Sequence, residues 1–314
     1  MRILITGGAG FIGSHIADRY LTDGHEIAII DDLSTGRWEN IPEQIRWQSH
    51  YQMGILAENL EEYFKSFSPE VVSHHAAHAN LRASVIDPIA NANVNVLGTI
   101  RMLELSRKYG VKRFIFASTA GPIYGNMDME DGDLPFGESD PVRPSCPYGA
   151  GKLAAEHYIR LYGDMYGLPY VIFRYANVYG PRQVPASEAG VVTIFAQAIL
   201  NGERPTIFGD GTKTRDYVYV DDIVDANVLA LAKGEMETFN LGNGFECSDQ
   251  EIFDFVRDAI GTWVVPVYGE KRPGEIEHYR LENFLAWWNL GWEPKISTRE
   301  GIRRTVEWCR GKKA

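Results

Sequence analysis

Cysteine is scarce in this chain, at three of its 314 residues. Cys146, Cys247 and Cys309 lie far apart, and no two of them have the CxxC spacing of a metal or redox site. The sequence therefore excludes a disulfide framework and gives no indication of a zinc site.

Long apolar runs are also missing. No run approaches the ~20 residues that a helix needs to cross a bilayer. The chain enters a strand-like segment at once, without the pattern of a signal peptide. We therefore expect a cytoplasmic protein with no membrane partner.

Positive charge is in deficit, with 31 Lys and Arg against 42 Asp and Glu and a net charge of -11. Nonspecific binding to nucleic acid is disfavoured, because contacts to phosphates need a basic face. A small anionic substrate would have to be held by a few arginines placed locally at its site.

A glycine-rich turn near the N-terminus indicates a ligand. The mostly apolar Arg2–Thr6 predicts a strand, and residues 14–21 have the apolar spacing of a helix. Gly7, Gly10 and Gly13 lie between them. In a dinucleotide-binding turn, such glycines permit the sharp turn, the approach of backbone to a pyrophosphate and close helix packing. The phosphates then lie at the helix N-terminus.

An acidic pair follows the second predicted strand, residues 26–30. Asp31 lies about 20 residues beyond the glycines, where a carboxylate accepts from the adenosine ribose. The anion would repel a 2′-phosphate, which favours NAD over NADP; the alternative is that Asp31 only starts a turn. After Asp32, the polar residues 33–36 can close over the adenosine end.

Strands alternate with helices along the first half of the chain. The fold class predicted from this alternation is α/β, a Rossmann-type doubly wound parallel sheet. The further strands are expected at residues 45–48, 70–74, 113–118 and 169–174, and the further helices at residues 56–67 and 91–109.

Longer polar loops begin after the strand at 169–174. We therefore expect an NAD-binding domain at residues 1–176, which also receives residues 217–243. Residues 177–314 would form most of a smaller C-terminal α/β substrate domain.

Three histidines cluster after the strand at 70–74. A metal site is disfavoured, because a strand sends His74 and His75 to opposite faces and no Asp, Glu or Cys cluster accompanies them. Ala76 and Ala77, beside His78, suit close approach of the backbone to a nucleotide.

An unusual asparagine, Asn95, lies inside the predicted helix 91–109. It either anchors neighbouring backbone near the site or is an ordinary polar residue of a surface helix.

Hydroxyl groups end the strand at 113–118. Ligands of open α/β sheets bind beyond the carboxyl ends of the strands, where Ser118 and Thr119 lie. For Ser118 alone, a hydrophilic turn is the alternative.

An acid–base pair is predicted on the helix that begins near Pro147. Tyr148 and Lys152 are four residues apart and share one face. The lysine ammonium, with a positive nicotinamide, favours the phenolate and lowers the pKa of the tyrosine toward a usable range. Such pairs also occur on ordinary amphipathic helices. This one follows a dinucleotide turn, a ribose-binding acid and a hydroxyl-bearing strand end in that order, which indicates catalysis.

With these features the chain resembles the extended short-chain dehydrogenase/reductases, and among them the nucleotide-sugar 4-epimerases of UDP-glucose 4-epimerase type. The resemblance extends over essentially the whole length. The segments that carry it are residues 7–13, 31–36, 173–182, 207–211, 214–222 and 272–275, together with Tyr148 and Lys152.

One position departs from this family. Its members commonly have a Ser or Thr about four residues before the Tyr-Gly pair, and here that residue is Ala120. Thr119 is the expected replacement and Ser118 the second choice. Related 4,6-dehydratases usually have an Asp-Glu pair in this turn; Ala120, Gly121 and Pro122 supply no acid, which argues against dehydration.

The substrate half contains the local arginines that a diphosphate needs, Arg215 and Arg272. Val191 and Val192 begin a predicted helix, whose backbone amides would meet the nucleotide. By resemblance, Asn177 bonds the diphosphate or sugar, and Tyr279 lies at the wall of the sugar pocket, where its bulk favours an unsubstituted hexose.

The resemblance completes two sets of expected contacts and implies a homodimer packed through helices 91–109 and 153–166. The cofactor set is Gly7, Gly10, Phe11, Ile12, Gly13, Asp31, Asp32, Ser34, Thr35, Gly36, Ala76, Ala77, His78, Asn95, Ser118, Tyr148, Lys152 and Tyr175. The substrate set is Thr119, Tyr148, Asn177, Val191, Val192, Arg215, Arg272, Glu275 and Tyr279.

The expected reaction is NAD-dependent inversion of C4 of a UDP-hexose, interconverting UDP-glucose and UDP-galactose through a transient 4-keto sugar. An epimerase or reductase acting on UDP-GlcNAc, UDP-glucuronate or a GDP-sugar would share the same motifs. A non-catalytic NAD-binding regulator is a further alternative, against which the intact Tyr148 and Lys152 count.

Overall fold

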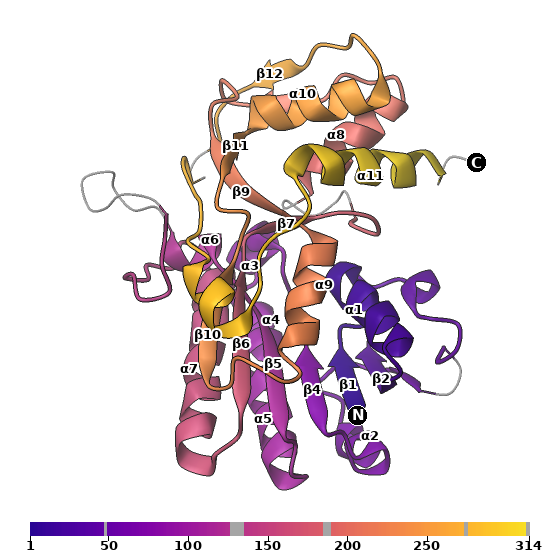
Figure 1. Cartoon of the computed structure of the whole chain (residues 1–314), viewed down its shortest axis with the longest axis vertical. Helices are drawn as coiled ribbons and strands as arrows, with labels where there is room; N and C mark the ends of the chain where they lie inside the picture. The colour runs from indigo at the N-terminus through magenta and orange to yellow at the C-terminus, as the bar shows by residue number, and fades with distance from the viewer. Residues whose placement is uncertain (47–48, 126–134, 185–189, 273–275, 312–314) are drawn as a thin grey trace.

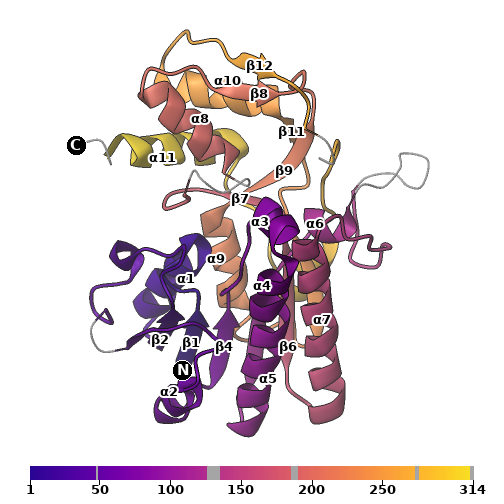
Figure 2. The same cartoon turned by 180° about the vertical axis from the view of Figure 1, so that it is seen from behind.

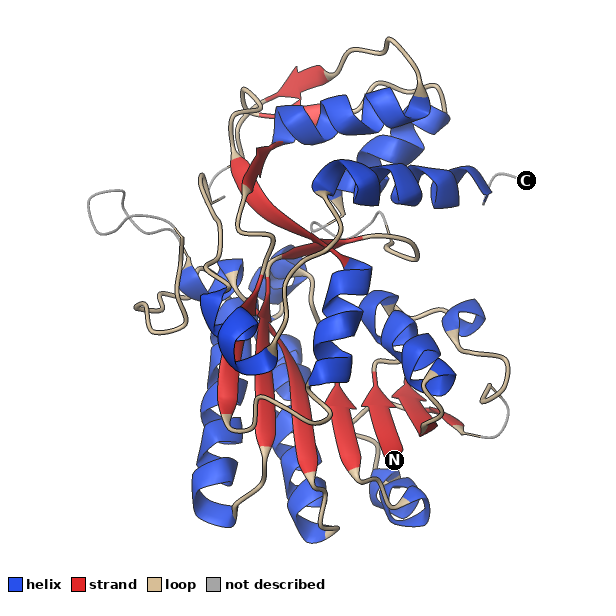
Figure 3. Ribbon diagram, in the orientation of Figure 1, coloured by secondary structure: helices blue, strands red, loops and turns tan. Residues whose placement is uncertain are grey.

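A computed structural model describes residues 1–46, 49–125, 135–184, 190–272 and 276–311. A large parallel sheet lies between two layers of helices, and a smaller group of elements lies beyond the carboxyl ends of its strands (Figures 1 and 3).

The main sheet has seven strands in the order β10-β6-β5-β4-β1-β2-β3, and every neighbouring pair is parallel. This confirms the predicted doubly wound α/β fold. The strands are β1 (Arg2–Thr6), β2 (Glu26–Asp31), β3 (His50–Gln52), β4 (Val71–His74), β5 (Arg113–Thr119), β6 (Tyr170–Tyr175) and β10 (Glu237–Leu241).

Apolar side chains cover both faces of this sheet. Along β1, Leu4 packs into the core on one face, whereas Ile3 and Ile5 pack into the core on the other. Helices α1 (Phe11–Thr22) and α9 (Val220–Leu229) cover the second face. Seen from behind, α5 (Thr99–Lys108) and α7 (Pro147–Tyr166) lie over the first face, to which α2 (Leu60–Phe67) also packs (Figure 2).

The helix expected at 91–109 begins earlier and is not regular. Asp87 caps α4 (Pro88–Ala92) by accepting from the Ala90 amide at 2.9 Å, and the proline occupies the first turn. A π-helical segment, η2 (Asn93–Gly98), then leads into α5. Asn95 lies in this segment, which is of a kind often found at functional sites.

The third strand was wrongly expected at residues 45–48. Ile45 and Arg46 lie in a turn, residues 47–48 are outside the described residues, and the strand that pairs with β2 is β3. The Arg46 guanidinium bonds the carbonyl of Ile41 at 2.8 and 3.2 Å, and this contact stabilises the turn.

The smaller group of elements contains two short sheets and three helices that pack together. The three-stranded sheet has the order β11-β9-β7 and the two-stranded sheet pairs β12 with β8. Its elements are β7 (Asn177–Tyr179), α8 (Val191–Leu200), β8 (Thr206–Phe208), β9 (Thr214–Tyr219), β11 (Glu246–Ser248), α10 (Asp249–Ile260), β12 (Val267–Gly269) and α11 (Thr298–Gly311).

The chain passes between the two groups more than once. It leaves the main sheet after β6, returns with α9 and β10, and leaves again. The predicted domain boundary at residue 176 stays a prediction. The remaining short elements are η1 (Trp38–Asn40), α3 (Leu81–Ile86), α6 (Gly121–Tyr124) and η3 (Ala286–Leu290). Within the described ranges, no helix has the length and apolar character needed to cross a membrane.

Candidate active site

The glycine turn joins β1 to α1 and leaves little room for side chains. Gly7 has a φ of +70°, and a Cβ on Gly13 would lie 2.3 Å from the Gly7 carbonyl oxygen. Beside Gly10, the nearest atom that a Cβ would meet is that same oxygen at 3.2 Å. The helix begins at Phe11, so its first amides, including that of Ile12, point out of the helix end. This turn fits the pyrophosphate of a dinucleotide.

The end of β2 is tied to this turn through Asp31. Its carboxylate accepts from the amides of Ala9 at 2.9 Å and Leu33 at 2.8 Å. Burial raises the pKa of Asp31, while these two hydrogen bonds oppose the rise. Each carboxylate oxygen retains a lone pair, so Asp31 can still accept from a ribose hydroxyl.

The neighbouring Asp32 is exposed and accepts from the amide and hydroxyl of Ser34 at 2.9 and 2.6 Å. Gly36 packs closely, since a Cβ there would lie 2.7 Å from an Asp31 oxygen. Residues 31–36, among them Thr35, thus form an acidic loop beside the glycine turn.

Two of the three histidines are bonded to hydroxyl groups, His74 in the interior and His75 at a half-buried position. His74 bonds Thr6 at 2.6 Å and Thr99 at 3.0 Å through its two ring nitrogens, and His75 bonds Ser73 at 2.9 Å. Burial lowers the pKa of His74 and brings that of His75 to about 3, so both are neutral. In the described part of the chain, no group of three or more His, Cys, Asp or Glu side chains could hold a metal ion.

Asn95 anchors backbone, as one of its two interpretations predicts. Its Oδ1 accepts from the His78 amide at 2.9 Å and its Nδ2 donates to the His78 carbonyl at 3.0 Å, deep in the protein. This holds the segment from Ala76 to His78, including Ala77. The segment lies against the glycine turn, because a Cβ on Gly7 would be 2.7 Å from the Ala76 nitrogen.

Tyr148 and Lys152 lie together at the carboxyl end of β5, on the buried face of α7. The Lys152 ammonium donates to the Ala117 carbonyl at 2.8 Å and lies 4.5 Å from the centre of the Phe116 ring. The Tyr148 hydroxyl interacts with the side chain of Thr119. A tyrosine, a lysine and a hydroxyl therefore meet at the edge of the sheet where ligands bind.

Burial controls the protonation of this pair. It raises the pKa of Tyr148 to about 12, opposed by the hydrogen bond with Thr119, and lowers the pKa of Lys152 to about 7. The predicted lowering of the pKa of Tyr148 depends on Lys152 together with a positive nicotinamide, and it stays a prediction. Activation of the phenol needs a further positive charge beside it.

The two candidate hydroxyls have different partners. The Ser118 hydroxyl donates to Glu156 at 2.6 Å in the interior, whereas Thr119 reaches Tyr148. Ala120 is fully buried, and its amide donates to the Tyr175 carbonyl at 3.0 Å.

The Tyr175 side chain points into the core. Its hydroxyl accepts from Asn227 at 3.0 Å, and its ring stacks on Phe173 with the centres 6.1 Å apart. The backbone of Tyr175 lies beside Thr119 in the sheet, but its side chain is not brought to Tyr148.

The predicted substrate residues lie mostly in the smaller group of elements. Arg215 on β9 donates to the Thr214 carbonyl at 2.6 Å, and the Arg272 guanidinium lies 3.4 Å from the centre of the Phe208 ring. Asn177 begins β7 and is partly buried. Val191 and Val192 begin α8, as expected, and Glu275 lies outside the described residues.

Tyr279 links this group to the active edge of the main sheet. Its ring packs on the turn after β5, since a Cβ on Gly121 would lie 3.8 Å from it, and the positive charge of Arg215 acts on its pKa. Burial nonetheless raises that pKa well above its ordinary value. Tyr279 therefore packs beside the turn that follows Thr119, where the charges of Asp216 and Arg215 both act on it.

Two buried carboxylates were missed in the sequence. Glu156 lies four residues beyond Lys152, a spacing that places it on the same helix face. Asp216 follows Arg215 and accepts from the amides of Asn243, Gly244 and Leu281 at 2.6, 3.0 and 3.1 Å. For Asp216 the sequence offers no signal, because its partners are 27 to 65 residues away.

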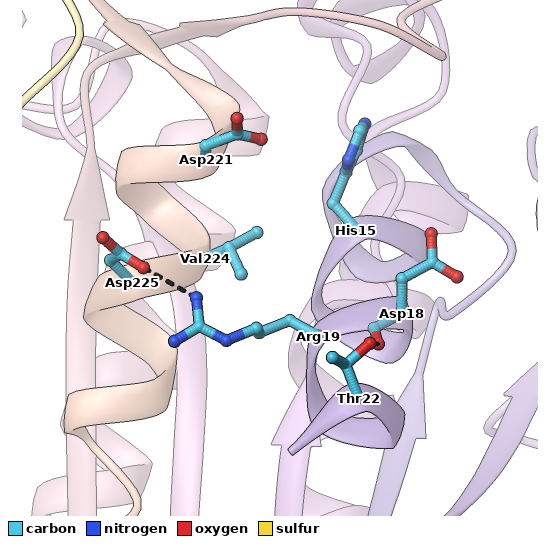
Figure 4. A pocket seen from close by; sticks show the side chains of 7 residues that line it. All are labelled: His15, Asp18, Arg19, Thr22, Asp221, Val224 and Asp225. Carbon is cyan, nitrogen blue, oxygen red and sulfur yellow. Dashed lines mark hydrogen bonds and ion pairs between the residues drawn. The ribbon is translucent and has the colours of Figure 1, made fainter.

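A hollow between α1 and α9 does not contain the predicted site (Figure 4). Its charged residues form ion pairs, among them Arg19 with Asp225 at 2.8 Å and Asp18 with Arg182 at 2.6 Å. The hollow is lined by His15, Asp18, Arg19, Thr22, Asp221, Val224 and Asp225.

Comparison with known proteins finds relatives that match over the whole chain. The UDP-glucose 4-epimerase of Mycolicibacterium smegmatis is 43% identical over 99% of both chains. The crystal structure of the Thermotoga maritima UDP-glucose 4-epimerase with UDP-glucose has a TM-score of 0.96 at 44% identity, with full coverage of both chains. The Thermus thermophilus UDP-glucose 4-epimerase complex with NAD has a TM-score of 0.91 at 43% identity and covers 99% of both.

The family model that matches residues 3–242 is that of the NAD dependent epimerase/dehydratase family. The chain therefore belongs to this family, which confirms the predicted membership and the NAD cofactor.

Proposed function

We propose that the protein inverts C4 of a UDP-hexose and so interconverts UDP-glucose and UDP-galactose. The observation that carries this proposal is the meeting of Tyr148, Lys152 and Thr119 at the carboxyl end of β5. The relatives with the same fold over the whole length, named as UDP-glucose 4-epimerases, support this choice of substrate.

The cofactor would be held along the glycine turn and the acidic loop. The first amides of α1 would bind the pyrophosphate, and Asp31 would accept from the adenosine ribose. Asn95 would act through the backbone of His78. When bound, NAD supplies a hydride acceptor with a positively charged ring.

The chain's own residues would move the proton. Tyr148, as phenolate, removes the proton of the sugar 4-hydroxyl, with the Thr119 hydroxyl bridging between them. The Lys152 ammonium stabilises the phenolate. The 4-keto sugar then presents its opposite face, and Tyr148 returns the proton when C4 is reduced.

The diphosphate would be held outside the main sheet. We infer that Arg215 and Arg272 bind it, because both lie in the segments that carry the family resemblance and a guanidinium can bind a diphosphate through two bonds. Asn177 and the amides at the start of α8, at Val191 and Val192, would add further contacts. Tyr279 would form the wall of the sugar pocket.

We also propose a homodimer, packed through α7 and the helical stretch formed by η2 and α5. The support is a set of exposed apolar side chains on these helices. They are Leu97, Tyr158, Leu161, Met165 and Tyr166, which are 39 to 59% exposed. We further propose that this activity belongs to galactose metabolism, since UDP-galactose is one of the proposed substrates, and that it takes place in the cytoplasm.

Incubation of purified protein with UDP-glucose, without added cofactor, tests the function. We expect UDP-galactose to form and NAD to be released when the protein is denatured. Y148F is the control and should form no product. If NAD is found without product, other nucleotide sugars become the substrates to test. If none of them is converted, the protein would instead be a non-catalytic NAD-binding regulator.

A further inference from the structure

Three side chains on the buried face of α7 lie against the last residues of strand β5. Tyr148, Lys152 and Glu156 are spaced by four residues, and all are 8% exposed or less. Lys152 donates to the carbonyl of Ala117, and Glu156 accepts from the hydroxyl of the next residue, Ser118, at 2.6 Å. The catalytic pair and Glu156 are therefore docked on the same strand end.

Glu156 is also fixed from the opposite side. Its Oε1 accepts from Arg174 Nε at 3.0 Å and its Oε2 from an Arg174 terminal nitrogen at 2.8 Å, a bidentate pair with side chains 0 and 4% exposed. Arg160 adds a contact at 2.9 Å. Arg174 in turn donates to the Tyr124 hydroxyl at 2.9 Å, in the turn that follows Thr119.

The charge of Glu156 acts on Lys152. Burial lowers the pKa of Lys152, and the field of Glu156 raises it. The other groups near the ammonium are the Phe116 ring, His74 at the end of β4 and His75, the residue after it. Both histidines are neutral, because burial and the lysine charge lower their pKa values. Glu156 itself stays ionised: burial raises its pKa, but the contacts with its arginines lower it further.

We propose that Glu156 is a positioning residue for the Tyr148–Lys152 pair: its carboxylate, held by Arg174 and Ser118, fixes α7 on β5 and keeps Lys152 as an ammonium ion. Its role in turnover rests on the proposed function. Glu156 acts through Lys152, which in its charged form stabilises the phenolate.

The protonation of Lys152 can be measured directly. Purified protein is labelled with ¹³C at lysine, and the ε-carbon resonance that disappears in K152M is titrated by NMR. We expect E156Q to lower the Lys152 midpoint by about one to two pH units. The alkaline limb of the kcat/KM profile with UDP-glucose should move by the same amount.

Two variants separate charge from packing. E156D retains the charge on a shorter side chain, so the midpoint should stay close to that of the parent while kcat falls. E300Q removes a carboxylate bonded to Arg303 and Arg304 on α11, and it should change neither. An unchanged Lys152 midpoint in folded E156Q would overturn the proposal, as would equal losses in E156Q and E156D without any shift.

A folding failure of E156Q has its own remedy. E156M/R174M replaces both members of the buried pair, and Arg160 keeps its bond to the Thr238 hydroxyl. Because a negative and a positive charge are removed together, the Lys152 midpoint should fall by less than in E156Q, and a midpoint at or above that of the parent overturns the proposal. If the parent does not epimerise UDP-glucose, the proposed function fails, while the NMR midpoint still decides the action of Glu156 on Lys152.

Discussion

At the scale of single residues, the structure separates two hydroxyls that the sequence leaves as alternatives. Ser118 is bonded to Glu156, and Thr119 reaches Tyr148. We expect T119V to lower kcat by about 100-fold, the low end of a lost acid–base contact, and S118A to lower it by less than about tenfold. Steady-state kinetics with UDP-glucose measure both. The reverse ranking would identify Ser118 as the bridging hydroxyl.

Asp216 gives a prediction of pH dependence. Burial raises its pKa to about 6, although three amides oppose the rise. Because the folded-state pKa lies above the ordinary value of 3.8, this residue stabilises the fold most below that value. Its contribution decreases as pH rises from 3.8 to about 6.

Urea unfolding of the parent and D216N, measured from pH 4 to 7, checks this sign. The free energy of unfolding of the parent, relative to the variant, should fall by about 2 kcal/mol over that range. A relative stability that rises with pH would show that the amide bonds outweigh the burial.

Tyr148 and Lys152 could be predicted from their spacing and from the motifs before them. The choice between Ser118 and Thr119 could not, because it depends on which side chain of another element each hydroxyl meets. The effect of burial on the pKa of Tyr148 could not be predicted either, since packing, and not the four-residue spacing, determines how deeply this side chain is buried.

At the scale of elements, α7 tests how closely the catalytic helix must pack. A Cβ on Gly149 would lie 2.1 Å from the Pro122 carbonyl oxygen, so G149A must displace the helix from the turn after β5. We expect a loss of about 1–3 kcal/mol in unfolding free energy, together with reduced kcat.

G151A is the matched control on the same helix. The nearest atom to a Cβ there is Asn91 Oδ1 at 3.5 Å, an ordinary contact. Better helix propensity should make this variant as stable as the parent or more so, by up to about 1 kcal/mol. Equal losses in both variants would show that any side chain on this face is harmful, whatever the distance to Pro122.

The strands and helices of the main sheet were largely predictable because apolar periodicity reports burial. The position of β3 was not predictable, because this strand has only three residues, none of them buried, and lies at the edge of the sheet with β2 as its one neighbour. The π-helical segment at 93–98 has no distinctive sequence pattern, because it is defined by its backbone hydrogen bonds. The bond between Asn95 and His78 also depends on the fold.

At the scale of the whole molecule, the exposed face of α7 predicts the oligomeric state. A charge at Leu161, which is 46% exposed, would be buried in the proposed homodimer without a partner. L161E should therefore elute as a monomer when the parent elutes as a dimer, as measured by light scattering. W263E changes a side chain that is 96% exposed elsewhere and should leave the state unchanged. A dimeric L161E would rule out this face.

The repeated crossing of the chain between its two groups of elements has a consequence for synthesis on the ribosome. β10 pairs with β6 but is separated from it by about 60 residues in the sequence. Synthesis of these residues takes roughly 3 to 13 s at common translation rates. Until β10 emerges, one edge of β6 has no partner strand, and until α9 emerges, α1 is not covered by it. During that interval the nascent chain exposes a strand edge that can pair with other chains. A chaperone that covers this edge would therefore act at this stage of synthesis.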